Sequence, residues 1–265
     1  MSSHGIRDKV FFITGGAQGM GKAISEALLE KGGKVFFVDI EDEIGRATLK
    51  ELCEKFGAGN VGFSHVDVVN RTDLEGAFKE AKQKFGYIDV LLNNAAVVDE
   101  INTKRVVDVN FLAVVQGTEI ASSFMRKDKG GRGGRIIAMS SVAGLKHYFQ
   151  LPVYNATKHA IRVYSTALAQ NPVNEVNGLE FASFHPDAST LGLFHDLDGR
   201  GVHDAVELVS SYDGILVPLE AVIEAFLELV SLEKMNGAVL FVAKNKKTYV
   251  EVKSHSIGDS FPPEI

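Results

Sequence analysis

The chain has 265 residues, of which 45% are hydrophobic and 23% are charged, and its formal net charge at pH 7 is −6. These values are typical of a globular protein with an ample core, and they argue against a basic nucleic-acid-binding surface. The single cysteine, Cys53, excludes an internal disulfide and a cysteine zinc cluster. We predict one domain over residues 1–265, with no metal site and no nucleic-acid partner.

Nothing in the sequence suggests a membrane segment. No apolar run reaches the roughly 18 residues that a membrane-spanning helix needs. The first eight residues are polar and are followed at once by a strand-like run, which is not the pattern of a signal peptide. We therefore expect a protein without a membrane span and with a cytoplasmic location.

The first motif along the chain is a glycine-rich turn between a strand and a helix. A β-rich apolar run ends at Ile13, and Thr-Gly-Gly-Ala-Gln-Gly-Met-Gly follows it before a helical pattern over residues 22–31. In this context Gly15 permits a tight turn, Gly19 lets the backbone approach a pyrophosphate, and Gly21 lets the helix pack closely on the strand. The N–H groups at the helix start favour phosphate, so we predict a dinucleotide site.

An acidic residue ends the second predicted strand. Residues 34–38 form this strand, and Asp39 follows it, twenty residues after Gly19. A carboxylate at this distance bonds the ribose hydroxyls of a bound dinucleotide and repels the extra phosphate of NADP, which favours NAD. The alternative is that Asp39 caps the helix that starts near Asp42, although it lies slightly early for that.

The third predicted strand, residues 61–66, is followed by Asp67. This aspartate either faces an adenine amino group or is an ordinary loop residue, and the sequence does not decide between the two. A helix is predicted over residues 72–85, with Thr72 as its N-cap and Glu75 completing a capping box.

The fourth predicted strand, residues 89–92, runs into Asn93-Asn94-Ala95-Ala96. The small residues leave room for a flat ligand at the end of the strand. The asparagine amides can tie this loop to neighbouring strands, and for Asn93 we favour that structural role.

A long helix is predicted over residues 104–125, with Asn110 between Val109 and Phe111. A buried amide is costly unless its hydrogen bonds are satisfied. Asn110 therefore either makes a core hydrogen bond that kinks the helix or binds a water molecule in a proton path.

The stretch from Ser140 to Lys158 is where we predict the chemistry. A buried strand over residues 136–139 ends in a loop of small residues, and Pro152 then starts a helix on which Tyr154 and Lys158, four apart, share one face. A nearby ammonium group lowers the pKa of a phenol, which makes it a usable general base or acid. Ser141 lies thirteen residues before the tyrosine and is placed to bond the same substrate oxygen. The alternative is a helix start with an ordinary tyrosine and a surface lysine.

The remaining elements complete an alternation of strands and helices. A sixth strand over residues 179–184, a helix over 218–232 and a last strand over 236–242 are predicted, and the irregular residues 188–216 between them are interpreted as a substrate lid. This alternation predicts an α/β fold of the Rossmann type. It is a doubly wound, mostly parallel seven-stranded sheet with helices on both faces and a ligand crevice beside strands one and four.

With these residues in order, the chain resembles the classical short-chain dehydrogenase/reductase family over nearly its whole length. The matching features are the glycine turn, Asp39, Asp67, Asn93-Asn94-Ala95-Ala96, Asn110, Ser141, Tyr154 and Lys158. Within the family it is similar to the NAD-dependent 15-hydroxyprostaglandin dehydrogenases and to insect alcohol dehydrogenases. The stretches that carry this similarity include Met139-Ser140-Ser141-Val142-Ala143-Gly144-Leu145 and Pro152-Val153-Tyr154.

The resemblance implies a set of roles. Tyr154 is the general acid and base, Lys158 lowers its pKa and holds the nicotinamide ribose, Ser141 orients the substrate oxygen, and Asn110 holds a water that links Lys158 to solvent. The expected NAD-binding residues are Gly15, Gln18, Gly19, Met20, Gly21, Asp39, Ile40, Asp67, Val68, Asn94, Ala95, Ala96, Tyr154, Lys158, Pro186, Ser189 and Thr190. The expected substrate residues are Ser141, Phe149, Leu151, Tyr154 and Leu193.

Two positions depart from the family pattern. Leu151 stands where the prostaglandin enzymes have a glutamine that contacts the substrate hydroxyl, and a leucine cannot make that bond. Pro186-Asp187 replaces the usual Pro-Gly, and Thr190 follows the proline by four residues where the family has five.

These features predict an NAD-dependent oxidoreductase that interconverts an apolar secondary or allylic alcohol and its carbonyl compound. Terpenoid, steroid or short aliphatic alcohols are alternative substrates, and a dehydrogenase-fold protein that binds NAD without turnover is an alternative function. The resemblance also implies a homodimer or homotetramer, with a face formed by the long helix and the helix that begins at Pro152.

Overall fold

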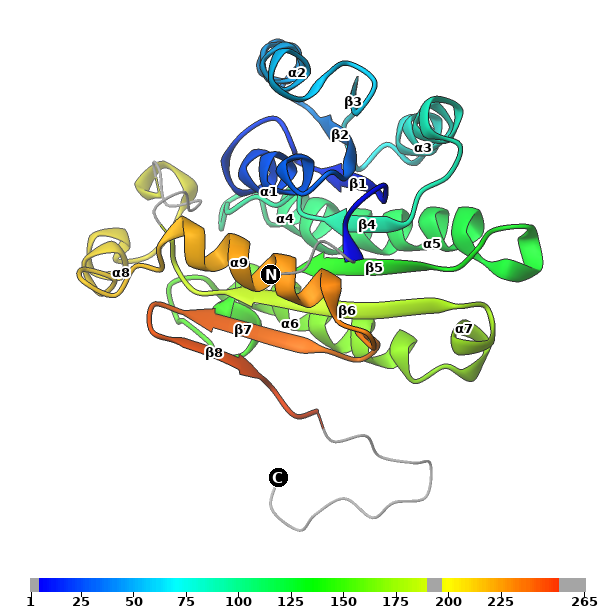
Figure 1. The fold of residues 1–265 in the computed structure, drawn as a ribbon. Helices are drawn as coiled ribbons and strands as arrows, with labels where there is room; N and C mark the ends of the chain where they lie inside the picture. The colour runs from blue at the N-terminus through cyan, green and yellow to red at the C-terminus, as the bar shows by residue number, and fades with distance from the viewer. Residues whose placement is uncertain (1–4, 190–196, 253–265) are drawn as a thin grey trace.

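The computed structural model describes residues 5–189 and 197–252, and an eight-stranded sheet forms its centre, in the order β3-β2-β1-β4-β5-β6-β7-β8 (Figure 1). The neighbouring strands from β3 to β7 pair in parallel, and β8 is antiparallel to β7. The predicted doubly wound sheet is confirmed, and the order reverses between β1 and β4 as expected. The strands are β1 (Val10–Thr14), β2 (Lys34–Asp39), β3 (Val61–His65), β4 (Val90–Asn93), β5 (Gly134–Met139), β6 (Leu179–Pro186), β7 (Val239–Ala243) and β8 (Lys246–Tyr249).

The predicted sheet of seven strands was one strand short of the observed sheet of eight. The additional strand, β8, has the sequence Lys-Lys-Thr-Tyr and lies at the edge of the sheet, with three of its four residues exposed. Its lysines give no apolar alternation, which is why the pattern did not reveal a strand. Charged residues of this kind are common on edge strands because they discourage pairing with another chain.

Helices cover both faces of the sheet (Figure 1). Helices α1 (Gly19–Glu30), α2 (Asp42–Phe56) and α9 (Leu219–Ser231) pack on one face, and α3 (Arg71–Phe85), α5 (Ala113–Met125) and α6 (Pro152–Ala169) pack on the other. In β1, Phe11 and Ile13 belong to the first core and Val10 and Phe12 to the second. A strand buried on both faces needs apolar residues at every position, and this explains the unbroken apolar runs in the sequence.

Some helix boundaries differ from the prediction. The helix expected over residues 104–125 consists of α4 (Thr103–Val107), a π-helical turn (Asp108–Leu112) and α5. The capping box at Thr72 was wrong: α3 begins at Arg71, and the side chain of Asn70 accepts hydrogen bonds from Thr72 N at 3.1 Å and Asp73 N at 3.3 Å. Asparagine is as good an N-cap as threonine, so the earlier residue starts the helix.

Two short helices were not predicted. They are α7 (Pro172–Val176) and α8 (Ala205–Ser210), with five and six residues. Elements this short do not complete two helical turns, so they leave no apolar periodicity that the sequence could show.

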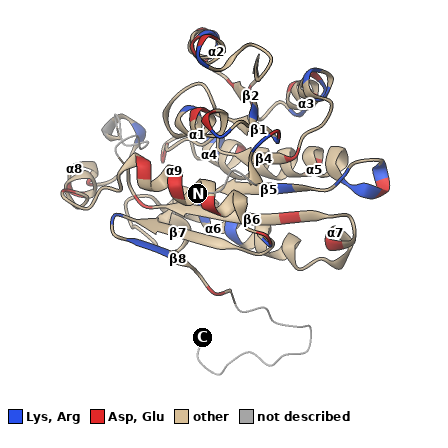
Figure 2. Cartoon of the chain, viewed as in Figure 1, with Lys and Arg blue, Asp and Glu red and all other residues tan. Residues whose placement is uncertain are grey.

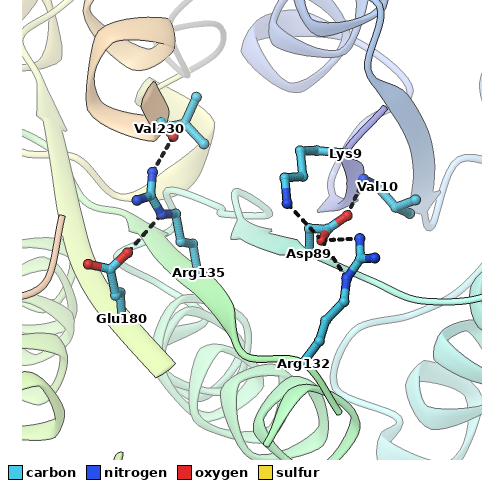
Figure 3. Close-up of polar contacts among 7 residues, drawn as sticks. All are labelled: Lys9, Val10, Asp89, Arg132, Arg135, Glu180 and Val230. Carbon is cyan, nitrogen blue, oxygen red and sulfur yellow. Dashed lines mark hydrogen bonds and ion pairs between the residues drawn. The ribbon is translucent and has the colours of Figure 1, made fainter. Parts of the chain in front are cut away.

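Charged contacts join neighbouring strands of the sheet at the amino ends of the parallel strands (Figure 3). The buried carboxylate of Asp89 accepts a hydrogen bond from Val10 N at 2.8 Å and from Arg132 Nη2 at 2.5 Å. Arg135 on β5 donates to Glu180 on β6 at 2.8 Å and to the carbonyl oxygen of Val230 at 2.6 Å. These contacts join β1, β4, β5 and β6 at the end opposite to the cavity described below, which leaves the carboxyl ends free for ligand binding.

The surface carries charges of both signs. Figure 2 shows Lys and Arg interspersed with Asp and Glu on α2 and α3. Among the residues that the structure describes, no helix combines the length and the apolar character needed to cross a membrane.

Candidate active site

A cavity of about 660 Å³ opens at the carboxyl ends of the parallel strands, where the strand order reverses. This volume is within the range of small-molecule and cofactor sites, which is about 300–1,000 Å³. Of the predicted cofactor residues, Thr190 lies outside the described residues, and the others all line the cavity: Gly15, Gln18, Gly19, Met20, Gly21, Asp39, Ile40, Asp67, Val68, Asn94, Ala95, Ala96, Tyr154, Lys158, Pro186 and Ser189.

The glycine turn has the shape that a pyrophosphate needs. Gly15 and Gly19 have φ angles of 65° and 56°, which favour glycine. A Cβ on Gly21 would lie 2.1 Å from the carbonyl oxygen of Gly15, so the helix can approach the turn only because that side chain is absent. Gln18, the N-cap residue of α1, makes no side-chain cap hydrogen bond, and the first turn of α1 has no acidic residue. The N–H groups at this helix start are therefore suited to bind an anion.

Hydrogen bonds connect the carboxyl ends of β1 and β4 beside the crevice. Asn94 Nδ2 donates to the carbonyl oxygens of Thr14 at 2.9 Å and Gly15 at 2.8 Å, and Thr14 Oγ1 accepts from Asn94 N and Ala95 N. Asn93 points away, and its amide donates to Thr118 Oγ1 at 3.2 Å on α5. The structural interpretation of Asn93 is confirmed.

Asp39 lines the cavity at the end of β2 and is itself held in place. Its Oδ2 accepts from Ala17 N at 3.0 Å, inside the glycine turn, and its Oδ1 accepts from Glu41 N at 3.2 Å. The second bond reaches the N-cap residue of α2, so the carboxylate also supports that helix start. Its position beside the turn agrees with a contact to a ribose.

Asp67 is engaged by a cation that sequence reasoning missed. Arg105 Nη1 lies 3.1 Å from Asp67 Oδ2, and Asp67 Oδ1 accepts from Val69 N at 3.2 Å. Arg105 and Asp67 both line the cavity. Arg105 stands 38 residues further along the chain on a separate helix, so no local pattern indicated the pair.

The predicted catalytic side chains converge on one wall of the cavity. Ser141 follows β5, and its side chain acts on Tyr154 to lower the pKa of the phenol. Lys158, one turn further along α6, is 2% exposed; its Nζ lies 5.4 Å from the centroid of the Tyr154 ring and donates to the carbonyl oxygen of Met139 at 2.9 Å. The alternative of a surface lysine is contradicted by this burial.

The protonation of this pair is governed by burial. Desolvation raises the pKa of Tyr154 to about 12, opposed by the hydrogen bond from Ser141, and it lowers the pKa of Lys158 to about 7. The net direction for the tyrosine is thus opposite to the lowering expected from an adjacent ammonium. Removal of the phenolate from water is the larger cause of this shift, and the Ser141 side chain opposes it.

Asn110 lies behind the cavity wall, fully buried in the π-helical turn. Its Oδ1 accepts from Val97 N at 2.8 Å, and its Nδ2 donates to Val97 O at 2.8 Å and to Thr157 Oγ1 at 3.4 Å. The side chain is therefore engaged by protein atoms, as a core hydrogen bond at an irregular point of the helix requires.

A buried histidine supports the loop that carries Ser141. His185 Nδ1 lies 2.9 Å from the carbonyl oxygen of Ser141, and its Nε2 lies 2.9 Å from Ser183 Oγ. A carbonyl only accepts, so Nδ1 carries the proton and Nε2 accepts from the serine hydroxyl. Burial lowers the pKa of His185 to about 3, so the ring is neutral.

The cavity has lining residues beyond the predicted cofactor set. Leu151 lines it, together with Tyr148, Asp187 and Tyr212. Tyr148 and Tyr212 share a side-chain hydrogen bond, and burial raises the pKa of both phenols. The two tyrosines, with Arg200, were missed because they lie in a loop and in the irregular segment, where no spacing rule applies.

Phe149 is not part of the cavity. Its side chain is 69% exposed, and its ring lies 6.0 Å from that of His203. The neighbouring Tyr148 lines the cavity instead. Leu193, the other substrate prediction, lies outside the described residues. Within those described residues, no group of His, Cys, Asp and Glu is arranged to hold a metal ion.

Comparison with known proteins gives a consistent result. Residues 9–180 match the family model described as short chain dehydrogenase. The 15-hydroxyprostaglandin dehydrogenase [NAD(+)] of Homo sapiens is 34% identical over 250 residues, which cover 91% of this chain and 93% of that protein. The 3-alpha-(or 20-beta)-hydroxysteroid dehydrogenase of Mycobacterium tuberculosis is 35% identical over 189 residues, covering 67% of this chain and 68% of the relative.

A solved structure supports the fold independently. A short chain dehydrogenase/reductase from Burkholderia phymatum, determined in complex with NAD, aligns with a TM-score of 0.79. The alignment covers 91% of this chain and 90% of the other, at 21% sequence identity. At that identity the likeness establishes the architecture of the sheet and its helices.

Proposed function

The chain belongs to the short-chain dehydrogenase family, and we propose that it is an NAD-dependent oxidoreductase that interconverts an apolar secondary or allylic alcohol with its carbonyl compound. One observation carries this proposal. Ser141, Tyr154 and Lys158 meet on the wall of the same cavity that contains the glycine turn and Asp39. The relatives named for alcohol or hydroxysteroid dehydrogenation support the same reaction class.

The cofactor and the protein divide the chemistry between them. Bound NAD supplies the nicotinamide carbon that accepts a hydride from the alcohol carbon. The Tyr154 hydroxyl exchanges the proton of the substrate oxygen, and the Ser141 hydroxyl, on the same wall of the cavity, orients that oxygen. In the oxidation the Tyr154 phenolate would take up the proton of the substrate oxygen while bound NAD would supply the hydride acceptor, and in the reduction the phenol would return that proton.

Lys158 and Asn110 support the proton carrier. We assign to Lys158 the binding of the nicotinamide ribose and, when it is protonated, stabilisation of the phenolate. The Asn110 amide is bonded to Val97 and Thr157. We therefore propose that Asn110 stabilises the irregular helical turn at the back of the site. Any water molecule in the proton path would then be held by backbone groups of that turn.

The NAD preference follows from charge. Asp39 is buried at the end of β2, beside the glycine turn, with both oxygens held by backbone N–H groups. A carboxylate fixed in this place accepts bonds from ribose hydroxyls and repels a phosphate on the same ribose. NAD is therefore proposed as the cofactor.

The segment over residues 188–216 is proposed as the substrate lid. Its two ends are joined, because Val217 N donates to the carbonyl oxygen of Ala188 at 2.8 Å. Its described apolar residues pack with Leu151 and Tyr154 in one buried cluster, and they include Leu197, Val202, Ala205, Leu208 and Tyr212. A loop with joined ends and an apolar underside is suited to cover an apolar substrate.

A homodimer is proposed on the face formed by α4, the π-helical turn and α6. These elements pack on one another and expose Val107, Leu112 and Val163, at 42%, 45% and 57%. Large apolar side chains exposed on adjacent helices are typical of a face that another chain covers.

A screen of alcohols and ketones tests the reaction. The purified chain is incubated with NAD or NADH and with secondary alcohols of three kinds, namely prostaglandins, steroids and terpenoid or short aliphatic alcohols, while the absorbance of NADH is followed. We expect turnover with at least one apolar alcohol and a clear preference for NAD over NADP. Tight NAD binding without turnover on any alcohol or ketone would instead favour a binding protein, the alternative that Asp187 in place of the family glycine suggests.

A further inference from the structure

The start of α6 is held by a carboxylate from another part of the chain. Glu100 belongs to the loop between β4 and α4, and its two oxygens bond two successive N–H groups of α6. Oε2 accepts from Val153 N at 3.0 Å, and Oε1 accepts from Tyr154 N at 2.9 Å. One of the two bonded atoms is thus the backbone nitrogen of the proposed acid and base.

The helix has no local substitute for this cap. Leu151, at the N-cap position, makes no side-chain cap hydrogen bond, and Pro152 has no N–H to satisfy. The first backbone bond of the helix is donated by Asn155 to Leu151 at 2.9 Å. The N–H groups of Val153 and Tyr154 precede it, so Glu100 is the partner that the structure gives them. A negative charge at a helix start is also favourable in itself.

Glu100 is joined at the same time to the substrate side of the cavity. Its backbone N–H donates to the carbonyl oxygen of Arg200 at 2.7 Å, and Arg200 Nη1 lies 3.4 Å from the carbonyl oxygen of Val98. Gly201 packs closely against Ile101 beside this contact, since a Cβ on Gly201 would lie 2.6 Å from Ile101 Cγ1. Val98 and Arg200 both line the cavity, so the loop that carries Glu100 connects the lid side to the catalytic helix.

We propose that Glu100 is a positioning residue for Tyr154. Its bidentate carboxylate fixes the first turn of α6, and so it sets where the phenol stands relative to the Ser141 hydroxyl and the substrate oxygen. This inference rests on the proposed function, since the position of the phenol matters only if the phenol carries a proton in the reaction. A displacement of about 1 Å in a reacting group can reduce a rate by as much as about a hundredfold.

The test compares Glu100→Gln with Glu119→Gln, a matched change on the exposed surface of α5, where Glu119 pairs with Arg71. A glutamine retains one accepting oxygen but turns an N–H₂ toward the second backbone N–H, so the bidentate cap is lost. The first readout is hydrogen exchange of the backbone amides over residues 153–158. We expect exchange to be about tenfold faster in Glu100→Gln and unchanged in Glu119→Gln.

The second readout is turnover per NAD-binding site, measured with an alcohol that the wild-type protein oxidises. We expect kcat to fall about tenfold in Glu100→Gln, with the Kd of NAD nearly unchanged, because the glycine turn and Asp39 are untouched. A residue that merely supports folding would lower the number of NAD-binding sites and leave turnover at each site unchanged. If Glu100→Gln does not fold, Glu100→Asp, in which the carboxylate falls short of both amides, is expected to show the same selective loss.

The outcomes separate this inference from the proposed function. Unchanged amide exchange, or faster exchange with normal turnover per site, would overturn the positioning role and leave the oxidoreductase function standing. A wild-type protein that turns over no alcohol would overturn the proposed function, and the positioning role would fall with it.

Discussion

Asn110 and Val97 are joined by a reciprocal pair of hydrogen bonds, each 2.8 Å long, in which the side-chain amide accepts from the Val97 N–H and donates to the Val97 carbonyl. Val97 lies in the loop between β4 and α4, and it lines the cavity. The pair therefore fastens the irregular turn of the long helix to the cavity wall, and the fully buried amide has its bonding capacity used by the protein.

The first prediction concerns Asn110→Ala. The change leaves both backbone groups of Val97 without their partner in a partly buried place, so the free energy of unfolding should fall by about 2–4 kcal/mol. Turnover should fall as well, because the cavity wall loses its support. Urea unfolding measures the stability loss. Asn70→Ala, which removes the exposed cap of α3, should cost about 1 kcal/mol and leave turnover unchanged. Equal effects of the two variants would contradict the assignment.

The second prediction concerns the proton carrier. Tyr154→Phe retains the ring and removes only the hydroxyl, so turnover should fall to below about one hundredth, the size of a lost general base, while NAD affinity stays nearly unchanged. Tyr164→Phe is the matched control: it lies on the same helix, and its ring packs edge-on against Phe111. That variant should retain wild-type turnover. Steady-state rates and NADH binding provide both measurements, and a Tyr154→Phe protein with more than a few per cent of the rate would argue against the role.

The third prediction concerns cofactor choice. Asp39→Asn retains an oxygen that can accept from Ala17 N and removes the negative charge. Repulsion of the NADP phosphate disappears, so the preference for NAD over NADP, expressed as the ratio of kcat/KM values, should narrow by about tenfold, or about 1.4 kcal/mol. Asp42→Asn changes a nearby carboxylate that pairs with Arg46, and it should leave the ratio unaltered. An unchanged ratio in Asp39→Asn would mean that the carboxylate does not face the ribose.

Local patterns in the sequence were sufficient for most of the fold and for the centre of the site. The glycine turn, Asp39 and the Tyr154–Lys158 pair are each recognisable within one strand-turn-helix unit, and the structure brings them to one cavity. The sheet order follows from the regular alternation of strands and helices. What these predictions share is that a short stretch of chain contains both the residue and the reason for its position.

Features that depend on contacts between distant segments could not be predicted. Glu100 caps a helix that begins more than fifty residues later, and Arg105 pairs with Asp67 across 38 residues, so neither has a local signature. The pKa of Tyr154 was predicted in the wrong direction for a related reason. The sequence shows the lysine four residues away, but the depth of burial that raises the pKa depends on the whole fold.

The fourth prediction concerns assembly. The wild-type protein should sediment as a dimer or tetramer at micromolar concentration, because the exposed apolar side chains of α4, the π-helical turn and α6 gain from being covered. Val163→Arg places a charge on this face and should yield a monomer with unchanged secondary structure. Val176→Arg is the control, since Val176 is 79% exposed on α7. Sedimentation velocity distinguishes the species, and a monomeric wild-type protein would refute the proposed face.

The last prediction concerns acid stability and His185. Burial lowers the pKa of this histidine from 6.5 to about 3, so between these values the unfolded chain binds a proton that the folded chain does not. The free energy of unfolding must therefore fall as the pH falls through this window, by at most about 1.4 kcal/mol per pH unit. Between pH 7.5 and pH 5 the contribution of His185 amounts to about 2 kcal/mol.

His185→Gln is expected to be less stable at pH 7.5, because its contacts with Ser141 and Ser183 change, but to lose about 2 kcal/mol less on acidification. His147→Gln, which changes an exposed histidine, is the matched control. Urea unfolding of the three proteins at both pH values measures the difference, and parallel losses in all three would show that His185 does not remain neutral in the folded chain.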